Sequence, residues 1–455
     1  MRMQWNKLLN NKRLRRPNEK PSSRPLKLNP FQLDQERIIF SQPFRRLKDK
    51  TQVHPFSDND HVRTRLTHSL EVATVGQSLG TLVGSEIIER YELKNFKSED
   101  FGNIIKAACL AHDIGNPPFG HIGEEAVREW FNEKENNEKL FEEMTKAKRS
   151  DFQRFDGNAQ GFRIITQTEN YKGNGGLQLT FATLATLMKY PWPSTHNKAN
   201  KNKFGFFQSE QNYIEEIAEQ VGLLPTRDGA WYRHPLAYLV EAADDICYAI
   251  IDLEDGIDMG ALSFRYYEEF IKGYLKQDKE YEGWESEYKN LETTKQKISY
   301  LRNKAITKLI EEASESWLKH EVDISHGNFE YPLLDKVEGN GFVQDAKKIA
   351  KEEIFINHKK IYIEIASYKI LYGLLDAFSE AALQGKGDDF ESGKNKRLFT
   401  LMGEDAPKSE CSRYETLMKV IDFISGMTDR FALGMYRQLD GISLGGMTPA
   451  PLEIK

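Results

Sequence analysis

The chain has 455 residues, a net charge of −6 at pH 7, 39% hydrophobic residues and 29% charged residues. No apolar run approaches the ~20 residues of a membrane span, so the composition favours a soluble globular protein with no membrane partner. The N-terminus lacks the apolar segment of a secretory signal, which predicts a cytoplasmic protein. The acidic net charge argues against a protein that is permanently coated with nucleic acid.

The N-terminal 34 residues are predicted to form an irregular basic arm. Four prolines between positions 17 and 30 interrupt any helix. Only residues 1–50 are clearly basic, so this part of the chain is the candidate contact for single-stranded DNA or for a neighbouring subunit. The second contact is the favoured one.

From residue 35 onward the apolar positions follow a helical period almost throughout, which predicts an all-α fold. The length exceeds that of a typical single core, so we expect a catalytic core over residues 35–265 and a helical region over 266–455 that completes the site and makes oligomer contacts. Residues 266–320 are strongly charged and are interpreted as a solvated helical face or an oligomer contact. Residues 132–160 and 192–212 are polar and interrupted, which indicates long loops or a partly mobile insertion.

The first strongly periodic stretch, residues 67–91, predicts a helix with a stripe of glycines. Gly76, Gly80 and Gly84 recur at every fourth position. Glycine inside a helix costs roughly 1 kcal/mol relative to alanine. Three glycines on one face therefore predict a second helix packed very closely against the first.

The next helix is predicted from "NIIKAACLAHDIG", and its end carries the first candidate functional residues. It is expected to end at Asp113, with Gly115 as its stop and Pro117-Pro118 preventing continuation. The last turn would then present His112 and Asp113 at an edge. Further helices are predicted from "HIGEEAVREWFNEKE" and from "PLAYLVEAADDICYAIIDLEDG".

A histidine followed by an acid is a weak signal by itself. With 10 His and 69 Asp plus Glu, composition alone leads us to expect about 1.5 such pairs. Two occur, His112-Asp113 and His320-Glu321, and the second is interpreted as an accidental pair because it has no neighbouring histidine and no Gly/Pro break. The cysteines at 109, 247 and 411 are odd in number and far apart, which predicts reduced thiols and no disulfide or zinc set.

A metal site at the His112-Asp113 pair would need further ligands, and the sequence offers them on helices. Imidazoles and carboxylates together suit first-row divalent ions. His68 begins the glycine-striped helix, and Asp244 lies in "EAADDICY". Tyr248 and Asp252 follow Asp244 at i+4 and i+8, and such a polar stripe on an apolar helix is costly unless it faces a ligand or solvent. Each residue alone is more often a cap or a core residue, but the combination indicates a metal site.

Six motifs, in order, resemble those of bacterial deoxyguanosinetriphosphate triphosphohydrolases, a family of HD-domain phosphohydrolases. They are "RRLKDKTQV", "VRTRLTHSLEV", "AHDIGNPPFGHIGEE", "MKYPW", "EAADDICYAIIDLEDG" and "FISGMTDRFA", within residues 37–435. The resemblance implies an HD-domain helical core that uses Mg²⁺, Mn²⁺ or another first-row divalent ion. It also implies conversion of dGTP or another dNTP and water to deoxynucleoside and inorganic triphosphate. A homo-oligomer, with a hexamer as one candidate, and a regulatory dNTP or single-stranded DNA are further expectations.

The resemblance assigns a role to each matching position. The implied metal ligands are His68, His112, Asp113 and Asp244, with Asp244 preferred to Asp245 because only it has Tyr248 and Asp252 at the family's spacing. The implied catalytic residues are His121 and its supporting acid Glu124. The implied substrate contacts are Gln52 on the nucleoside side, Arg65, Lys189, Tyr190 and Arg430 at the phosphates, and Tyr248 and Asp252 at the deoxyribose.

The implied chemistry is attack of water on the α-phosphorus, with His121 protonating the leaving 5′-oxygen as a general acid. The alternative role for His121 is that of an in-line nucleophile. Two other classes of function remain open at this point. One is an HD-domain nucleotidase or phosphodiesterase acting on another nucleotide ester, and the other is a nucleotide or single-stranded DNA sensor.

Overall fold

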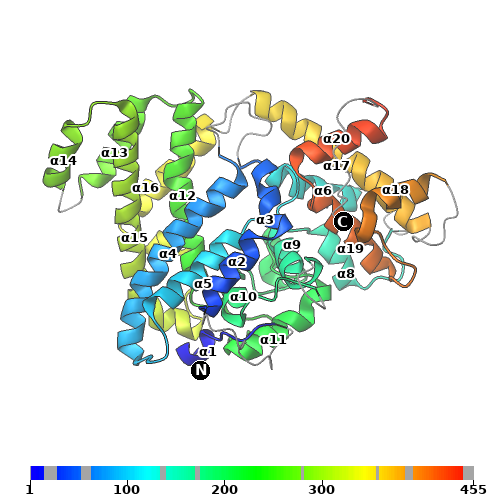
Figure 1. Ribbon diagram of the computed structural model, residues 1–455, viewed down its shortest axis with the longest axis horizontal. Coiled ribbons are helices and arrows are strands. Elements are labelled where there is room, and N and C mark those ends of the chain that lie inside the picture. The colour runs from blue at the N-terminus through cyan, green and yellow to red at the C-terminus, as the bar shows by residue number, and fades with distance from the viewer. Residues whose placement is uncertain are drawn as a thin grey trace.

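The computed structural model describes residues 2–14, 28–52, 63–133, 140–169, 175–277, 281–354, 358–384 and 393–443. Within these ranges every regular element is a helix, accompanied only by isolated β-bridges (Figure 1). The all-α prediction is confirmed. None of the described helices is both long enough and apolar enough to cross a membrane.

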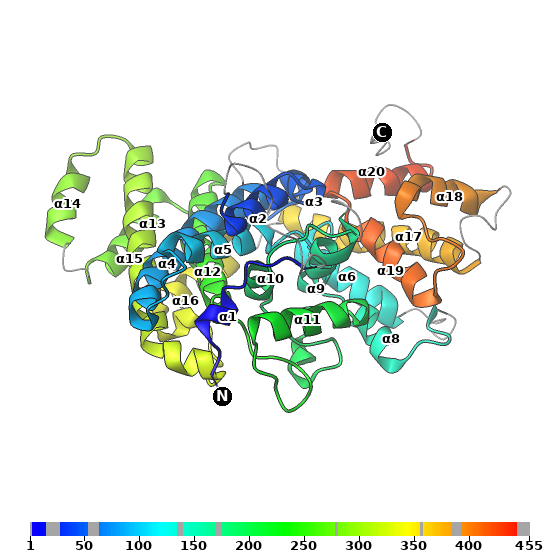
Figure 2. The same cartoon turned by 60° about the horizontal axis from the view of Figure 1, so that its bottom comes forward.

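The buried apolar side chains form two hydrophobic cores. The helices that surround them lie toward opposite ends of the long axis in both views (Figure 1, Figure 2). The helices around the first core are α1 (Trp5–Leu8), α2 (Pro30–Ile39), α3 (Gln42–Arg46), α4 (Arg65–Tyr91), α5 (Ser98–Ala111), α10 (Phe181–Leu187), α11 (Gln211–Val221), α12 (Ala237–Asp258), α13 (Phe264–Leu275), α14 (Tyr281–Lys289), α15 (Thr294–His326) and α16 (Asn340–Ile349). The helices around the second core are α6 (Gly120–Glu133), α8 (Lys146–Gln153), α17 (His358–Gln384), α18 (Lys394–Met402), α19 (Arg413–Ser425) and α20 (Asp429–Leu439).

Shorter elements connect these helices. α9 (Gly157–Arg163) contributes side chains to both cores. Single turns of 3₁₀-helix are η1 (Leu47–Asp49), η3 (Asn197–Lys201), η4 (Gln208–Glu210), η5 (Leu333–Lys336) and η8 (Gly403–Asp405). Two π-helical segments are η2 (Ile164–Thr168) and η6 (Ala350–Ile354). The C-terminal region is thus shared between the cores, because α13 to α16 pack on the first and α17 to α20 on the second.

The glycine stripe of α4 faces α5 at very short range, as predicted. A Cβ atom added at Gly80 would lie 2.9 Å from both the Gly102 Cα and the Phe101 carbonyl oxygen of α5. One added at Gly76 would lie 2.6 Å from the Cys109 Sγ, and one at Gly84 would lie 2.8 Å from the Phe101 ring. No side chain fits between these backbones, so the stripe sets the distance between the two helices that carry His68 and His112.

Residues 2–14 of the predicted N-terminal arm pack in the first core. The Trp5 ring lies 5.4 Å from Phe101 and 5.9 Å from Trp317, centroid to centroid. Arg2 and the Trp5 indole both donate to the buried carboxylate of Glu321. The short α1 buries a few large apolar side chains too close together in sequence to produce a periodic signal. The arm's expected boundary at residue 34 also falls inside α2, and residues 15–27 lie outside the described part of the chain.

In the His320-Glu321 pair, which the sequence analysis interpreted as accidental, the glutamate is a structural anchor. This glutamate also accepts hydrogen bonds from the Tyr91 hydroxyl at 2.7 Å and the Ser325 hydroxyl at 2.8 Å. A buried carboxylate of this kind is stable only when such donors surround it.

One of the two polar stretches predicted as loops contains a helix. Residues 132–160 contain α8, because Phe152 and Phe155 pack into the second core and Asp151 is buried as an acceptor for the Ser194 and Tyr414 hydroxyls. Residues 192–212 are irregular apart from 3₁₀ turns and the start of α11, but they bury three phenylalanines. The charged segment 266–320 is helical, as expected, and the three cysteines are free thiols.

Candidate metal centre and active site

Two helix ends and the interior of a third helix bring the candidate ligands together. His68 lies in the first turn of α4, His112 caps the C-terminus of α5, and Asp113 follows it directly. One potential ligand atom from each of these residues lies within 4.8 Å of the others. Asp244 projects from α12 so that its Oδ1 lies 3.0 Å from His68 Nε2 and 3.7 Å from His112 Nε2.

The orientation of His112 suits a metal ligand. Its Nδ1 donates to the Cys109 carbonyl oxygen at 2.6 Å, which leaves Nε2 as the free acceptor. Nε2 lies 3.6 Å from the Asp113 Oδ1. A backbone acceptor on the far ring nitrogen is the usual support of a metal-bound histidine. Two imidazoles and two carboxylates on one centre fit a first-row divalent ion.

Asp113 is held in its charged form by its neighbours. Burial raises the pKa of this carboxyl, but the Arg65 guanidinium, with Nη1 2.9 Å from Oδ2, together with the two histidines lowers the pKa well below its usual range. Arg65 is itself buried, and Gly120 lies against it with φ +61°. A Cβ atom at Gly120 would meet the guanidinium, so the start of α6 requires glycine there.

The structure brings Asp244, and not its neighbour Asp245, to the histidines. Asp245 lies on another face of α12, where its Oδ1 accepts from the Lys347 Nζ of α16 at 2.9 Å. One turn after Asp244, the Tyr248 ring lies 5.0 Å from the His68 ring. The register that places Asp244 at the centre therefore also places Tyr248 beside it.

The predicted nucleoside contacts lie around Tyr248. The Gln52 Nε2 donates to the Tyr248 hydroxyl at 2.7 Å, although the two residues come from distant parts of the chain. Asp252, one turn further along α12, is buried, and its burial together with the nearby Asp255 and Asp244 carboxylates raises its pKa to about 7, against the opposing charge of His68. A carboxyl in this state is able to donate as well as accept a hydrogen bond.

His121 and Glu124 face each other on the first turn of α6. The His121 Nδ1 lies 3.2 Å from Glu124 Oε2, and the histidine side chain is 69% exposed while the glutamate is 2% exposed. Glu124 also accepts from the Gly157 backbone N–H at 2.8 Å and from the Lys203 Nζ at 3.2 Å. Burial raises the pKa of Glu124, but the hydrogen bond from His121 and the charge of Lys203 outweigh it and lower the pKa to about 2.

Lys203 was missed by the sequence analysis. It lies in the polar stretch 192–212, and no motif spacing connects it to Glu124. Its Nζ also lies 3.5 Å from the buried Asp156 carboxylate. Lys203 thus neutralises two buried acids beside His121, a pairing visible only in the folded chain.

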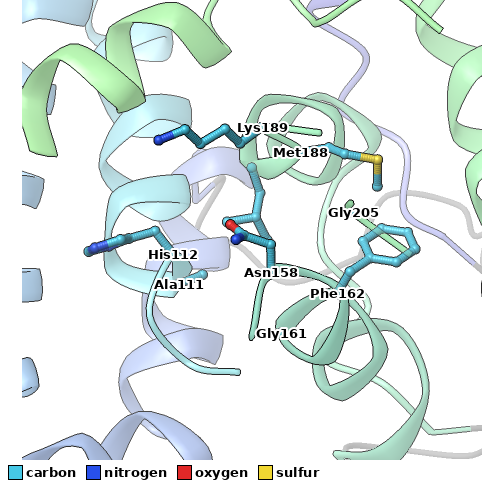
Figure 3. A pocket seen from close by; sticks show the side chains of 9 residues that line it. Ala111, His112, Asn158, Gly161, Phe162, Met188, Lys189 and Gly205 are labelled. Carbon is cyan, nitrogen blue, oxygen red and sulfur yellow. The ribbon is translucent and has the colours of Figure 1, made fainter. Parts of the chain in front are cut away.

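Lys189, the first residue of the predicted phosphate-binding pair, lines one pocket with His112 and Asn158. The Lys189 and His112 side chains extend toward the same side of this pocket (Figure 3). The Lys189 Nζ lies 3.2 Å from Glu241 Oε1 and 5.7 Å from the Tyr190 ring centroid. Burial lowers the pKa of Lys189, but the Glu241 carboxylate outweighs it and raises the pKa.

Arg430, the remaining predicted phosphate contact, lies on α20. It is exposed on the first turn of α20, whereas its neighbour Asp429 is buried. Asp429 accepts from the Phe119 backbone N–H at 2.9 Å, so it is the aspartate that faces the turn between the metal ligands and His121.

Comparison with known proteins supports the same reading of the helical core. The HD domain family matches residues 65–165, which include α4, α5, α6 and α9. A deoxyguanosinetriphosphate triphosphohydrolase-like protein of Pseudomonas aeruginosa is 45% identical over 450 residues, covering 97% of this chain and 99% of the relative. One of the same name from Synechocystis is 42% identical, covering 97% and 100%, respectively. A deoxyguanosinetriphosphate triphosphohydrolase of Salmonella arizonae is 30% identical, covering 90% and 93%.

The chain therefore belongs to the deoxyguanosinetriphosphate triphosphohydrolase-like family of HD-domain proteins. Membership makes it a phosphohydrolase of a metal-dependent family. The cluster of His68, His112 and Asp113 has ligand atoms close enough together that it could hold such an ion.

Proposed function

We propose that this protein is a dNTP triphosphohydrolase, which converts dGTP or another dNTP and water to the deoxynucleoside and inorganic triphosphate. The observation that carries the proposal is the position of the Tyr248 and Gln52 pair directly beside the candidate ligand His68. A substrate whose α-phosphate lies at the centre would extend its sugar toward this pair. The Salmonella relative bears the name of that activity.

Four residues would hold a divalent ion: His68, His112, Asp113 and Asp244. When bound, the ion supplies a Lewis acid for the α-phosphoryl oxygen. Mg²⁺ and Mn²⁺ are the first ions to test, because carboxylates provide half of the ligands.

The catalytic proton would come from His121. Water attacks the α-phosphorus, the bond from phosphorus to the 5′-oxygen breaks, and that oxygen must take up a proton to leave as an alcohol. Glu124 is ionised at neutral pH, and its Oε2 lies 3.2 Å from the His121 Nδ1, so it orients the imidazole ring. The large exposed fraction of His121 leaves it accessible to a substrate.

The triphosphate would be bound by cations already in place. Lys189 contributes a point charge that is paired with Glu241 in the structure, and Arg65 contributes a planar guanidinium next to Asp113. Tyr248 would close the space near the 2′ carbon and so select deoxyribose, while Asp252 would bind the 3′-hydroxyl.

The experiment that tests the proposal is chromatography of the products formed from a panel of dNTPs and NTPs with Mg²⁺ or Mn²⁺. Deoxynucleoside and intact triphosphate in equal amounts are expected. Release of orthophosphate or pyrophosphate would favour a nucleotidase of another type, and no turnover of any nucleotide would favour a sensor. Sedimentation of the full chain checks the predicted homo-oligomer.

A further inference from the structure

The turn between Asp113 and His121 is unusual because it combines backbone strain with an attachment to the C-terminal helices. Phe119 has φ +64° and Gly120 has φ +61°, so two consecutive residues adopt the left-handed conformation just before His121. A phenylalanine pays a steric penalty there and keeps this conformation only if its surroundings impose it. The contacts around residues 114–120 show what imposes it.

Lys50 provides the first of these contacts. Its side chain is buried, with 2% of the residue exposed, and its Nζ donates to the Asn116 carbonyl oxygen at 2.6 Å and to the Ser425 carbonyl oxygen at 2.8 Å. Asn116 lies in the turn, and Ser425 is the last residue of α19. One ammonium group therefore joins the turn to the end of a helix more than 300 residues later.

Asp429 provides the second contact from the same place. Its Oδ1 accepts from the Phe119 backbone N–H at 2.9 Å, and its Oδ2 accepts from the Thr51 backbone N–H at 3.0 Å and the Thr51 hydroxyl at 2.6 Å. Its carboxylate thus fixes the strained residue directly. Lys50 and Thr51 are adjacent in sequence. The two contacts therefore connect one short segment to the 114–120 turn and to the junction between α19 and α20.

We propose that Lys50 and Asp429 are positioning residues that fix the 114–120 turn, and with it the distance from the metal ligand Asp113 to the general acid His121. This inference rests on the proposed function for its catalytic part. Neither side chain needs to touch substrate. Both act by holding backbone atoms, and a displacement of about 1 Å at a reacting group is enough to lower a rate by about 10²-fold.

The test compares Lys50→Met and Asp429→Asn with Lys48→Met and Asp440→Asn in the full-length protein. Lys48 and Asp440 are exposed near the same elements, so they control for the substitutions themselves. We expect kcat for dGTP hydrolysis to fall by about 10²-fold in each test variant. We expect KM to change by less than about threefold, because ground-state binding groups are untouched. The two controls should retain the kcat of the unmodified protein.

A second readout does not depend on activity. Titration calorimetry with Mn²⁺ alone should show affinity lowered by about tenfold in Lys50→Met, because Asn116, which this lysine holds, donates to Asp113. If the unmodified protein hydrolysed no dNTP, the proposed function would fail while the Mn²⁺ titration still tested the positioning role.

The double variant Lys50→Met/Asp429→Asn sharpens the result. Both residues hold the same turn, so the kcat of the double variant should be close to that of the less active single variant. The two losses in kcat should not multiply. Multiplicative losses, or a Lys50→Met protein with the kcat and Mn²⁺ affinity of Lys48→Met, would overturn the proposal. So would a Lys50→Met protein that is unfolded both with and without Mn²⁺ while Asp429→Asn is fully active, because that pair of results assigns Lys50 to folding alone.

Discussion

His68 and Asp244 meet with Nε2 and Oδ1 3.0 Å apart, although 176 positions separate them in the chain. Their helices, α4 and α12, pack directly against each other, and His112 approaches the same Asp244 oxygen at 3.7 Å from α5. The centre is therefore built from the mutual packing of three helices, and each ligand depends on the position of the other two.

The first prediction concerns metal binding by the pair at the end of α5. Removal of one ligand from a four-ligand site should lower occupancy as well as chemistry, so Asp113→Ala and His112→Ala should each abolish metal binding and turnover together. Metal analysis of the purified variants checks this, with Asp323→Ala, exposed on α15, as the control. A folded Asp113→Ala protein with its metal and full activity would remove this pair from the site.

The second prediction separates two adjacent aspartates. Asp244→Asn should lose far more metal than Asp245→Asn, because only Asp244 faces the histidines while Asp245 is paired with Lys347. Metal content and thermal stability are measured for both variants. If Asp245→Asn lost more metal than Asp244→Asn, the ligand would be Asp245. Tyr248 and Asp252 would then lack the spacing on which their proposed roles depend.

The third prediction concerns the proposed general acid. His121→Ala should keep its metal and its affinity for dNTP but lose about 10²–10⁴-fold in kcat. Glu124→Gln should lose less, since the imidazole is still present. Comparison of kcat with the affinity for dNTP and with the metal content in both variants separates a loss of chemistry from a loss of binding. A His121→Ala protein with the kcat of the unmodified protein would contradict the assignment.

The fourth prediction is a pH dependence of stability from a histidine outside the site. Burial lowers the pKa of His234 from 6.5 to about 4, although the Leu8 carbonyl oxygen, 3.2 Å from the ring Nε2, acts in the opposite direction and raises the pKa. The unfolded chain then binds more protons between these values. The free energy of unfolding should fall by up to about 3 kcal/mol as the pH drops from 6.5 to 4.

Thermal unfolding of the protein and of His234→Gln at pH 7 and pH 5 measures this effect. The variant has no imidazole to protonate there, so its melting temperature should depend less on pH. His326→Gln, at the end of α15, is the control. Equal pH dependence in all three proteins would show that His234 does not control the acid side of the stability curve.

The fifth prediction concerns the helix pair beneath the centre. Gly80→Ala places a methyl group against the backbone of α5 and should destabilise the protein by about 1–3 kcal/mol. Gly273→Ala, on α13, has open space around the new Cβ and should be neutral or stabilising by up to about 1 kcal/mol. Chemical denaturation of the two variants checks the difference, and a Gly80→Ala protein as stable as Gly273→Ala would disprove the close packing.

Local signals in the sequence predicted the parts of the fold and site that depend on local rules. The glycine stripe of α4 predicted a close partner helix, and the Gly/Pro break after Asp113 predicted a helix end where α5 ends, within two residues. The contact of Lys203 with Glu124 was not predictable, because it joins a polar loop to a helix with no repeated spacing. The same holds for Arg2 and Glu321, whose pairing exists only after α15 has packed.

The burial of residues 2–14 has a consequence for how the chain is made. Trp5 leaves the ribosome before both of its ring partners, and 316 residues separate it from Glu321, which accepts its indole N–H. At 5–20 residues per second, synthesis of that interval takes roughly 15–60 s. During this time the Trp5 indole has no Glu321 carboxylate to donate to, so the N-terminal segment completes its packing only late in synthesis.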